Sequence, residues 1–142
     1  MKFWDASAIV PLVVSEPTTS QLTGRYAEDP DVMVWCLTAV EVWSAVARRR
    51  HDGQFRSPDM REARRRLERL SATWVEIDDV RQVRERARRI LETHRLRAAD
   101  SLQLGAALVA ANDRPGGLRF LTLDQELQEA AEREGFEAPD LT

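Results

Sequence analysis

FWDASAIVPLVV, residues 3–14, is an apolar run that the carboxylate of Asp5 interrupts near its start. Aspartate is a poor strand former and is rarely buried without a partner. The run predicts a first strand over residues 2–5 and a short helix over residues 8–15, with Ser7 as its N-cap. We therefore expect Asp5 where the first strand ends and the chain turns into a helix.

Short apolar runs alternate with helical patterns along the rest of the chain, which is typical of βαβ units and a parallel sheet. Further strands are predicted at residues 32–37, 73–77, 118–123 and, as a short last strand, 136–139. Helices are predicted at residues 18–28, 38–53, 57–70, 78–93, 98–112 and 124–134. Since no linker or internal repeat interrupts this pattern, we expect one domain over residues 1–142. Its predicted fold class is α/β, a three-layer α/β/α arrangement with a mostly parallel central sheet.

The composition is that of a folded protein in a reducing compartment. Hydrophobic residues make up 43% of the 142 residues and charged residues 32%, which argues against disorder. No apolar run approaches the roughly 20 residues that span a bilayer, and no secretion signal is recognisable at the start. Cys36 has no second cysteine with which to form a disulfide. We therefore expect a cytoplasmic protein.

Charge is distributed unevenly along the chain. The net charge is −3, yet residues 48–97 carry sixteen arginines against nine acidic residues. The segments before and after this region are acidic, and the single lysine is Lys2. Such asymmetry can mark a nucleic-acid surface, but it also fits solvated helix faces with paired charges. Both interpretations stay open from composition alone.

Four acidic residues stand out by their positions. Asp5 ends the first predicted strand, Glu41 lies in the first turn of the helix after the second, and Asp124 directly follows the strand at 118–123. Open parallel sheets build their sites at such strand ends, and Asp100 lies early in an apolar helix. Taken singly, Glu41 could form a capping box with Thr38. Asp5 and Asp124 could each serve as a turn or cap residue. Asp100 is harder to explain in this way, because a carboxylate in the first turn of a helix normally faces water.

Together these acids favour a site for a hard cation. Carboxylate oxygens gathered without His or Cys suit Mg²⁺ or Mn²⁺ rather than zinc. The two histidines, His51 and His94, lie in arginine-rich helix ends and are expected on the surface. No glycine-rich motif of the kind that cradles nucleotide phosphates is present.

Four short motifs then occur in an order that resembles a known family. They are D-x-S (Asp5, Ser7), T-x-x-E (Thr38, Glu41), R-x-x-D (Arg97, Asp100) and F-L-T-x-D (Phe120 to Asp124). The chain resembles PIN-domain ribonucleases, and specifically the VapC-type toxins of bacterial type II toxin–antitoxin pairs. The resemblance covers essentially the whole chain and implies a PIN-like fold.

The resemblance also implies an activity. The family's acidic quartet, which is catalytic and binds one or two Mg²⁺ or Mn²⁺ ions, matches Asp5, Glu41, Asp100 and Asp124. Ser7 matches a hydroxyl residue that supports the first aspartate, and Thr122 is expected in a similar part. The implied function is an endoribonuclease that hydrolyses RNA phosphodiester bonds by metal-activated water and acts as a toxin. The implied partners are a cognate antitoxin protein and a second copy of the chain in a homodimer.

Binding of RNA needs cations outside this site, because a cluster of carboxylates repels phosphate. Arg97 is the nearest arginine to the site by sequence. Arg48, Arg49 and Arg50 are further candidates for RNA contacts.

Two other functions are compatible with parts of the pattern. An Asp-based phosphatase or receiver domain also places an aspartate beside Mg²⁺ at a strand end. That class normally uses a lysine further along the chain, whereas Lys2 here precedes Asp5, and Ser7 stands where such a phosphatase has a second acid. A non-catalytic interaction module with a PIN fold is the second alternative.

Overall fold

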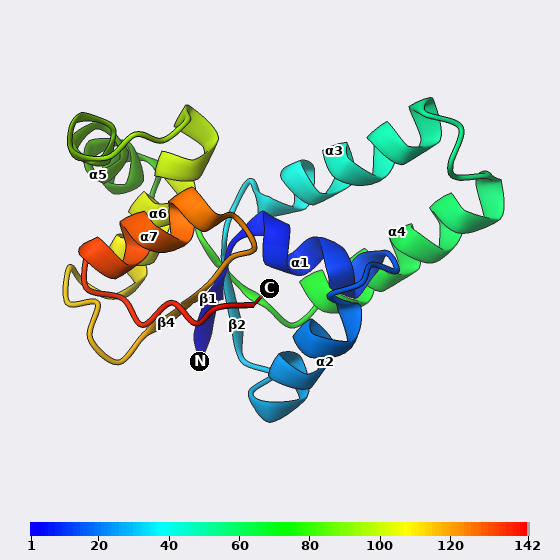
Figure 1. Ribbon diagram of the computed structural model, residues 1–142, viewed down its shortest axis with the longest axis horizontal. Helices are drawn as coiled ribbons and strands as arrows, with labels where there is room; N and C mark the ends of the chain where they lie inside the picture. The colour runs from blue at the N-terminus through cyan, green and yellow to red at the C-terminus, as the bar shows by residue number, and fades with distance from the viewer. Residues whose placement is uncertain (142) are drawn as a thin grey trace.

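A computed structural model describes residues 1–141, and within that range the chain forms four strands and seven helices (Figure 1). The strands are β1 (Lys2–Trp4), β2 (Val32–Trp35), β3 (Val75–Ile77) and β4 (Arg119–Leu121). The helices are α1 (Ala6–Val13), α2 (Thr19–Glu28), α3 (Thr38–His51), α4 (Ser57–Ser71), α5 (Val80–Thr93), α6 (Ala98–Ala110) and α7 (Gln125–Arg133). No helix among these residues is long and apolar enough to cross a membrane.

The four strands form one sheet in the order β3-β2-β1-β4, with every pair parallel. Phe3 of β1 pairs with Met33 of β2 on one side and with Phe120 of β4 on the other. Because all strands run in the same direction, their carboxyl ends meet at one edge of the sheet. Asp5 follows the central strand directly and therefore lies in the middle of that edge.

Side chains of the strands alternate between two apolar layers, as the period of two in a strand requires. Phe3 and Phe120 stack with ring centroids 5.5 Å apart and pack in the layer with α5, α6 and α7. Trp4 and Leu121, their neighbours in sequence, pack in the other layer with α1 to α4. Figure 1 shows these two groups of helices on opposite sides of the sheet. The predicted three-layer α/β/α class is confirmed.

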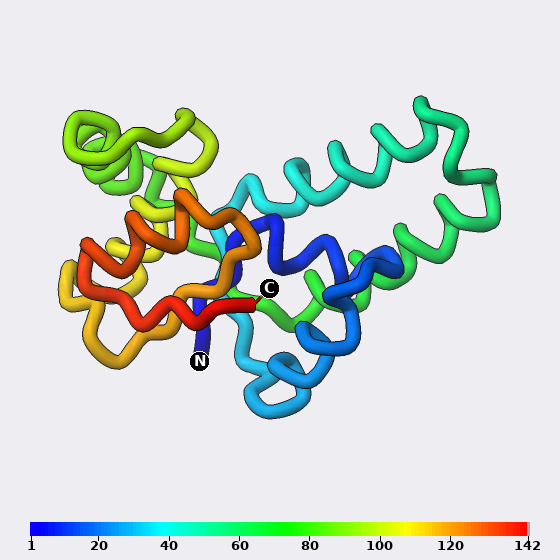
Figure 2. Tube along the Cα trace, viewed as in Figure 1, coloured from blue at the N-terminus to red at the C-terminus, as the bar shows by residue number. Residues whose placement is uncertain are grey.

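Helices α3 and α4 form an arm that projects from the sheet (Figure 2). α3 leads away from the carboxyl edge of the sheet, the chain turns back at Gly53, and α4 returns along it. Gly53 has a φ of 75°, which glycine adopts at little cost and which ends α3 where the sequence predicts. The Arg64 guanidinium lies 5.3 Å from the centre of the Trp43 ring and fastens the two helices together.

Two predicted helix caps are wrong. α1 begins at Ala6, and its N-cap is Asp5 rather than Ser7, because the Asp5 side chain accepts a hydrogen bond from the Ser7 backbone N–H at 3.2 Å. α3 begins at Thr38 with Leu37 as its N-cap, and the Thr38 side chain makes no capping hydrogen bond. In both cases the polar side chain is directed to a tertiary partner instead of its own helix end.

The strands are shorter than predicted, and the proposed last strand at residues 136–139 is reduced to a single bridge between Arg119 and Glu137. His94 also differs from its prediction: it is buried and its Nε2 lies 2.8 Å from the Glu134 carboxylate, whereas His51 is exposed as expected. The imidazole of His94 fills the space between the end of α5 and α7, which the local sequence does not reveal.

Candidate active site

Asp5 is buried, with 3% of its surface exposed, at the start of α1. Its Oδ2 accepts hydrogen bonds from the Ser7 hydroxyl at 2.5 Å and the Thr122 hydroxyl at 2.9 Å, besides the Ser7 backbone N–H. Burial raises the pKa of Asp5 above its usual range, and these hydrogen bonds act in the opposite direction. The carboxylate is thus held firmly by one oxygen in a place where its charge is costly.

Ser7 and Thr122 connect β1 to the end of β4. Their hydroxyl oxygens lie 3.1 Å apart. The Ser7 hydroxyl accepts the Leu123 N–H at 2.9 Å, and the Thr122 hydroxyl accepts the Asp124 N–H at 3.0 Å. These bonds fix the loop that delivers Asp124 to the carboxyl edge of the sheet. The geometry agrees with the supporting parts expected of both hydroxyls, and those parts stay predictions.

Asp124 is the N-cap of α7, since its Oδ1 accepts the Leu127 N–H at 2.9 Å. The purely structural explanation of Asp124 as a cap is therefore correct as far as one oxygen is concerned. Capping does not account for the second effect of Asp124, whose negative charge raises the pKa of Asp100 on α6.

Glu41 lies half-buried in the first turn of α3 and does not form the capping box with Thr38. Its Oε1 accepts a hydrogen bond from Gln103 Nε2 of α6 at 3.3 Å. Burial, and after it the charge of Asp5, raises the pKa of Glu41 to about 7, and the charge of Asp100 adds to the rise. A capping carboxylate at a helix N-terminus would have the opposite behaviour, because the helix dipole favours its charged form.

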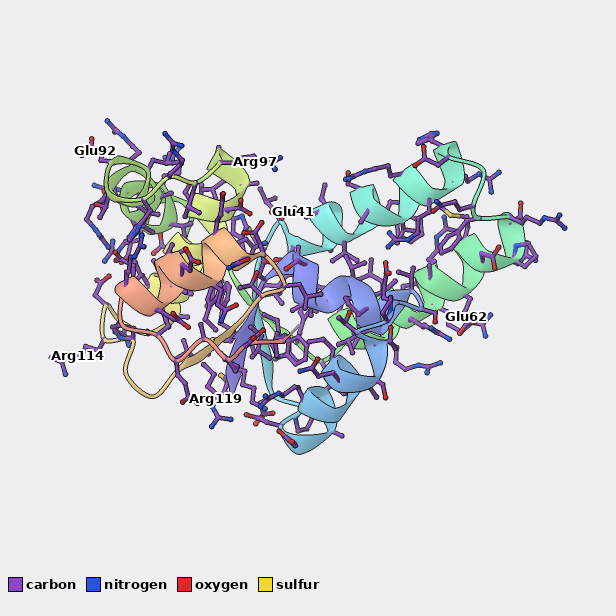
Figure 3. All side chains as sticks on the ribbon, viewed as in Figure 1. Glu41, Glu62, Glu92, Arg97, Arg114 and Arg119 are labelled. Atoms are coloured by element: carbon purple, nitrogen blue, oxygen red, sulfur yellow. The ribbon has the colours of Figure 1, made fainter. Side chains whose placement is uncertain are left out.

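Asp100 lies in the first turn of α6. The exposed Arg97, labelled in Figure 3, occupies the N-cap position of this helix. Burial raises the pKa of Asp100 to about 6, helped by the charges of Asp5 and Asp124, while the Arg97 guanidinium lowers it. Glu126 of α7 adds a further negative charge near Asp100. Arg97 is the one cation that acts on Asp100 among these contributions.

The structure therefore brings the acidic quartet together at one edge of the sheet, from β1, α3, α6 and the end of β4. Negative charges in this group raise the pKa values of Glu41 and Asp100, and a bound divalent cation would offset that repulsion. The quartet's donor set of oxygens alone fits Mg²⁺ or Mn²⁺. Within residues 1–141, no three acidic, His or Cys side chains lie close enough together to hold an ion as they stand.

The sequence model of the PIN domain family matches residues 2–133. This chain belongs to the PIN domain family. PIN domains are generally metal-dependent nucleases and usually bind divalent metal, so the fold and the carboxylate edge agree with the match. A search of curated proteins found no match.

The arginines that the sequence suggests for RNA contacts occupy different settings in this PIN domain. Arg97 lies beside the acidic quartet. Arg49 is engaged with Glu16 and with the Ala45 carbonyl at 2.9 Å, and Arg50 bonds the Ser57 hydroxyl at 3.5 Å. The Arg48 side chain is exposed and makes no hydrogen bond or ion pair to any residue in the described range 1–141.

The lysine that a phosphatase-like site would need is elsewhere. Lys2 is buried, and its Nζ bonds the Arg25 carbonyl at 3.3 Å, at the opposite end of β1 from Asp5. Lys2 therefore cannot take the part of the lysine that a phosphatase or receiver domain normally uses.

Sequence reasoning missed two residues of the site. Gln103 sits three residues after Asp100 in an apolar helix, where its contact with Glu41 depends on packing between segments 62 residues apart. Glu126 follows Asp124 by two residues, and its place in the first turn of α7 is the one local signal that could have found it.

Proposed function

We propose that this PIN domain is a Mg²⁺- or Mn²⁺-dependent endoribonuclease that acts as the toxin of a toxin–antitoxin pair. The observation that carries the proposal is the convergence of the acidic quartet, in which Asp5, Glu41 and Asp100 all have raised pKa values. Carboxylates with raised pKa values cluster at functional sites.

The quartet would hold the divalent cation through carboxylate oxygens that no hydrogen bond occupies. Bound there, a divalent ion neutralises charge that develops on phosphate and makes water a better nucleophile. Asp5 is the best-oriented ligand, because Ser7 and Thr122 hold one of its oxygens. The proposed reaction is hydrolysis of an RNA phosphodiester bond, which leaves a 5′-phosphate and a 3′-hydroxyl.

Arg97 and Arg48 are the arginines best placed to bind the RNA backbone. Arg97 adjoins Asp100. Arg48 lies on the same face of α3 as Glu41, since positions 41, 44 and 48 follow the spacing of one helix face. Arg49 and Arg50 are engaged with other side chains, so we assign them to the stability of the α3–α4 arm instead.

The remaining parts of the proposal concern partners and place. We propose a cognate antitoxin protein as the inhibitor, a homodimer as the assembled form, and the cytoplasm as the location. These features rest on the resemblance to VapC-type toxins. Membership of the PIN family and the negative charge of the site support them, because a basic partner segment would suit such a site.

The test combines growth and chemistry. Expression of the wild-type chain without an antitoxin should arrest growth, and the purified protein should cut RNA with Mg²⁺ or Mn²⁺ but not with EDTA. The Asp100→Asn variant should lose both effects. Cleavage that persists in EDTA would reject the metal-dependent mechanism. Growth arrest that survives Asp100→Asn would favour the non-catalytic interaction module.

A further inference from the structure

Gln103 is a fully buried amide in the largely apolar helix α6. It belongs to the run Gln103–Leu108 of α6, in which every side chain is buried. Burying an amide costs free energy unless its donors and acceptor find partners. A leucine or alanine would suit the surroundings better, so the amide calls for an explanation in terms of its contacts.

Both contacts of the amide lead to the first turn of α3. Nε2 donates to the Thr38 hydroxyl at 3.1 Å and to Glu41 Oε1 at 3.3 Å. The carbonyl Oε1 is buried and has no hydrogen-bond partner in residues 1–141. In this orientation the NH₂ group faces Glu41, which accepts the hydrogen bond when its carboxylate is ionised. The amide therefore donates to two side chains of α3, while its own carbonyl oxygen stays without a hydrogen bond to the described residues.

The contact links two members of the acidic quartet. Gln103 lies three residues after Asp100, about one turn further along α6. Its amide donates a hydrogen bond to Glu41 on α3. A hydrogen bond between them fixes how Glu41 lies with respect to the helix that carries Asp100. It occupies Oε1 only, so that Oε2 stays free of hydrogen bonds to the described residues.

A neutral donor such as the Gln103 amide can orient Glu41 without cancelling its negative charge, which a cationic donor cannot do. A lysine or arginine at position 103 would form an ion pair with Glu41 and compete with a metal for it. The amide stabilises the charged form of Glu41 and leaves the net charge of the quartet unchanged. Outer residues of this type orient metal ligands, and their loss weakens metal affinity about 10- to 100-fold.

We propose that Gln103 is a positioning residue, which holds Glu41 in the orientation that binds the divalent cation. The proposal rests on the proposed metal-dependent function and names a residue that this function requires beyond the quartet. Gln103 would act through Glu41 and touch neither the metal nor the RNA.

The test compares Gln103→Met with Thr38→Val. Methionine keeps the length and volume of glutamine but cannot donate to Glu41. Valine removes the other acceptor of the same amide and leaves the bond to Glu41. Binding of Mn²⁺ to each purified variant is measured by isothermal titration calorimetry, and folding is checked by circular dichroism. We expect Gln103→Met to weaken Mn²⁺ binding by about tenfold or more, and Thr38→Val to change it by less than about threefold.

A second comparison separates positioning from packing. In a Glu41→Gln background, Gln103→Met should weaken Mn²⁺ binding no further, since the ligand it orients is gone. Equal Mn²⁺ affinity of the wild type and Gln103→Met would overturn the inference and leave the proposed function intact. A wild type that binds no Mn²⁺ would overturn the proposed function, and the inference with it. Should Gln103→Met fail to fold, Gln103→Asn, whose shorter amide does not reach Glu41, is measured against the same expectation.

Discussion

At the scale of single residues, the site is built from carboxylates whose charge is costly in the metal-free protein. Asp5 is the extreme case, because burial raises its pKa although three donors bond to it. Asp5 and Asp124 each cap a helix as well. The proposed role as a metal ligand is compatible with capping, since the cap uses only one of the two carboxylate oxygens.

Replacing Asp5 by asparagine should separate stability from function. The amide keeps the shape and can still accept from Ser7 and Thr122, but the buried charge disappears. In EDTA we expect the Tm of Asp5→Asn to equal or exceed that of the wild type. Each kcal/mol that the loss of the buried charge adds to the free energy of unfolding should raise the Tm by about 3–4 °C. RNA cleavage should fall to background.

The matched control is Glu134→Gln, in a carboxylate whose pKa is lowered, first by the Arg89 guanidinium and also by His94. Here the charge stabilises the fold, so the substitution should lower the Tm measured in the same calorimetric scan. A clear drop in Tm for Asp5→Asn would contradict the view that the Asp5 charge is held for function.

At the scale of elements, α6 carries Asp100 and Gln103 and packs unusually closely on α5. A Cβ at Gly105 would lie 3.0 Å from the Val83 carbonyl oxygen and 3.2 Å from the Ala87 nitrogen. Gly105 therefore has a packing reason within a helix where glycine is otherwise unfavourable. The backbone of α5 sets the position of α6 and with it the position of Asp100.

We expect Gly105→Ala to lower the free energy of unfolding by about 1–3 kcal/mol, because the added methyl group pushes against the α5 backbone. Gly24→Ala is the control: nothing lies within 4 Å of a Cβ there, and alanine should stabilise α2 by up to about 1 kcal/mol. Urea denaturation of both variants measures the difference. Equal stabilities would show that α5 and α6 separate without cost.

Helix α3 carries Glu41 and Arg48 on the same face, about 10.5 Å apart along its axis. Arg48→Glu should weaken RNA binding and reduce the slope of log affinity against log salt by about one. Arg61→Glu on α4 makes the same charge change at an exposed arginine and should leave that slope nearly unchanged. Binding is measured by fluorescence anisotropy with the cleavage-deficient Asp100→Asn protein. If Arg48→Glu and Arg61→Glu show the same slope, Arg48 does not contact the RNA backbone and is simply a solvent-exposed side chain.

Site residues could be predicted from the sequence where the reason for their position lies in neighbouring residues, and could not where it lies in a distant segment. Asp5 and Asp124 were recognisable because a carboxylate that ends an apolar strand is a local anomaly, and parallel strands bring such ends together. Gln103 and His94 were not, because their partners Glu41 and Glu134 are 62 and 40 residues away. Thr38 shows the opposite failure: a fitting T-x-x-E pattern was outcompeted by a tertiary hydrogen bond from Gln103.

At the scale of the whole molecule, the metal-free site should make stability depend on pH. The pKa of Glu41 is raised from 4.5 to about 7, and that of Asp100 from 3.8 to about 6. A carboxyl group with a raised pKa holds its proton longer when folded than when unfolded. Its contribution to stability is therefore full below pH 4 and is lost as the pH rises through 6 to 7.

In EDTA we therefore expect the Tm to fall between pH 5 and pH 8. Added Mn²⁺ should reverse the trend, since the cation favours the ionised carboxylates. Glu41→Gln is the control, and its Tm should change less over the same interval because one of the two groups no longer titrates. A wild-type Tm that rises from pH 5 to pH 8 without metal would contradict the charge arrangement of the site.

The central claim is that Asp5, Glu41, Asp100 and Asp124 act as one metal-dependent ribonuclease site. The most direct measurement is the rate of cleavage of one labelled RNA at saturating Mn²⁺. It compares the wild type with Asp5→Asn, Glu41→Gln, Asp100→Asn and Asp124→Asn, after each variant is shown to be folded. We predict that every variant is slower by about 100-fold or more, because loss of an ionised ligand disables the shared site. Two or more variants that cleave within threefold of the wild-type rate would contradict the claim.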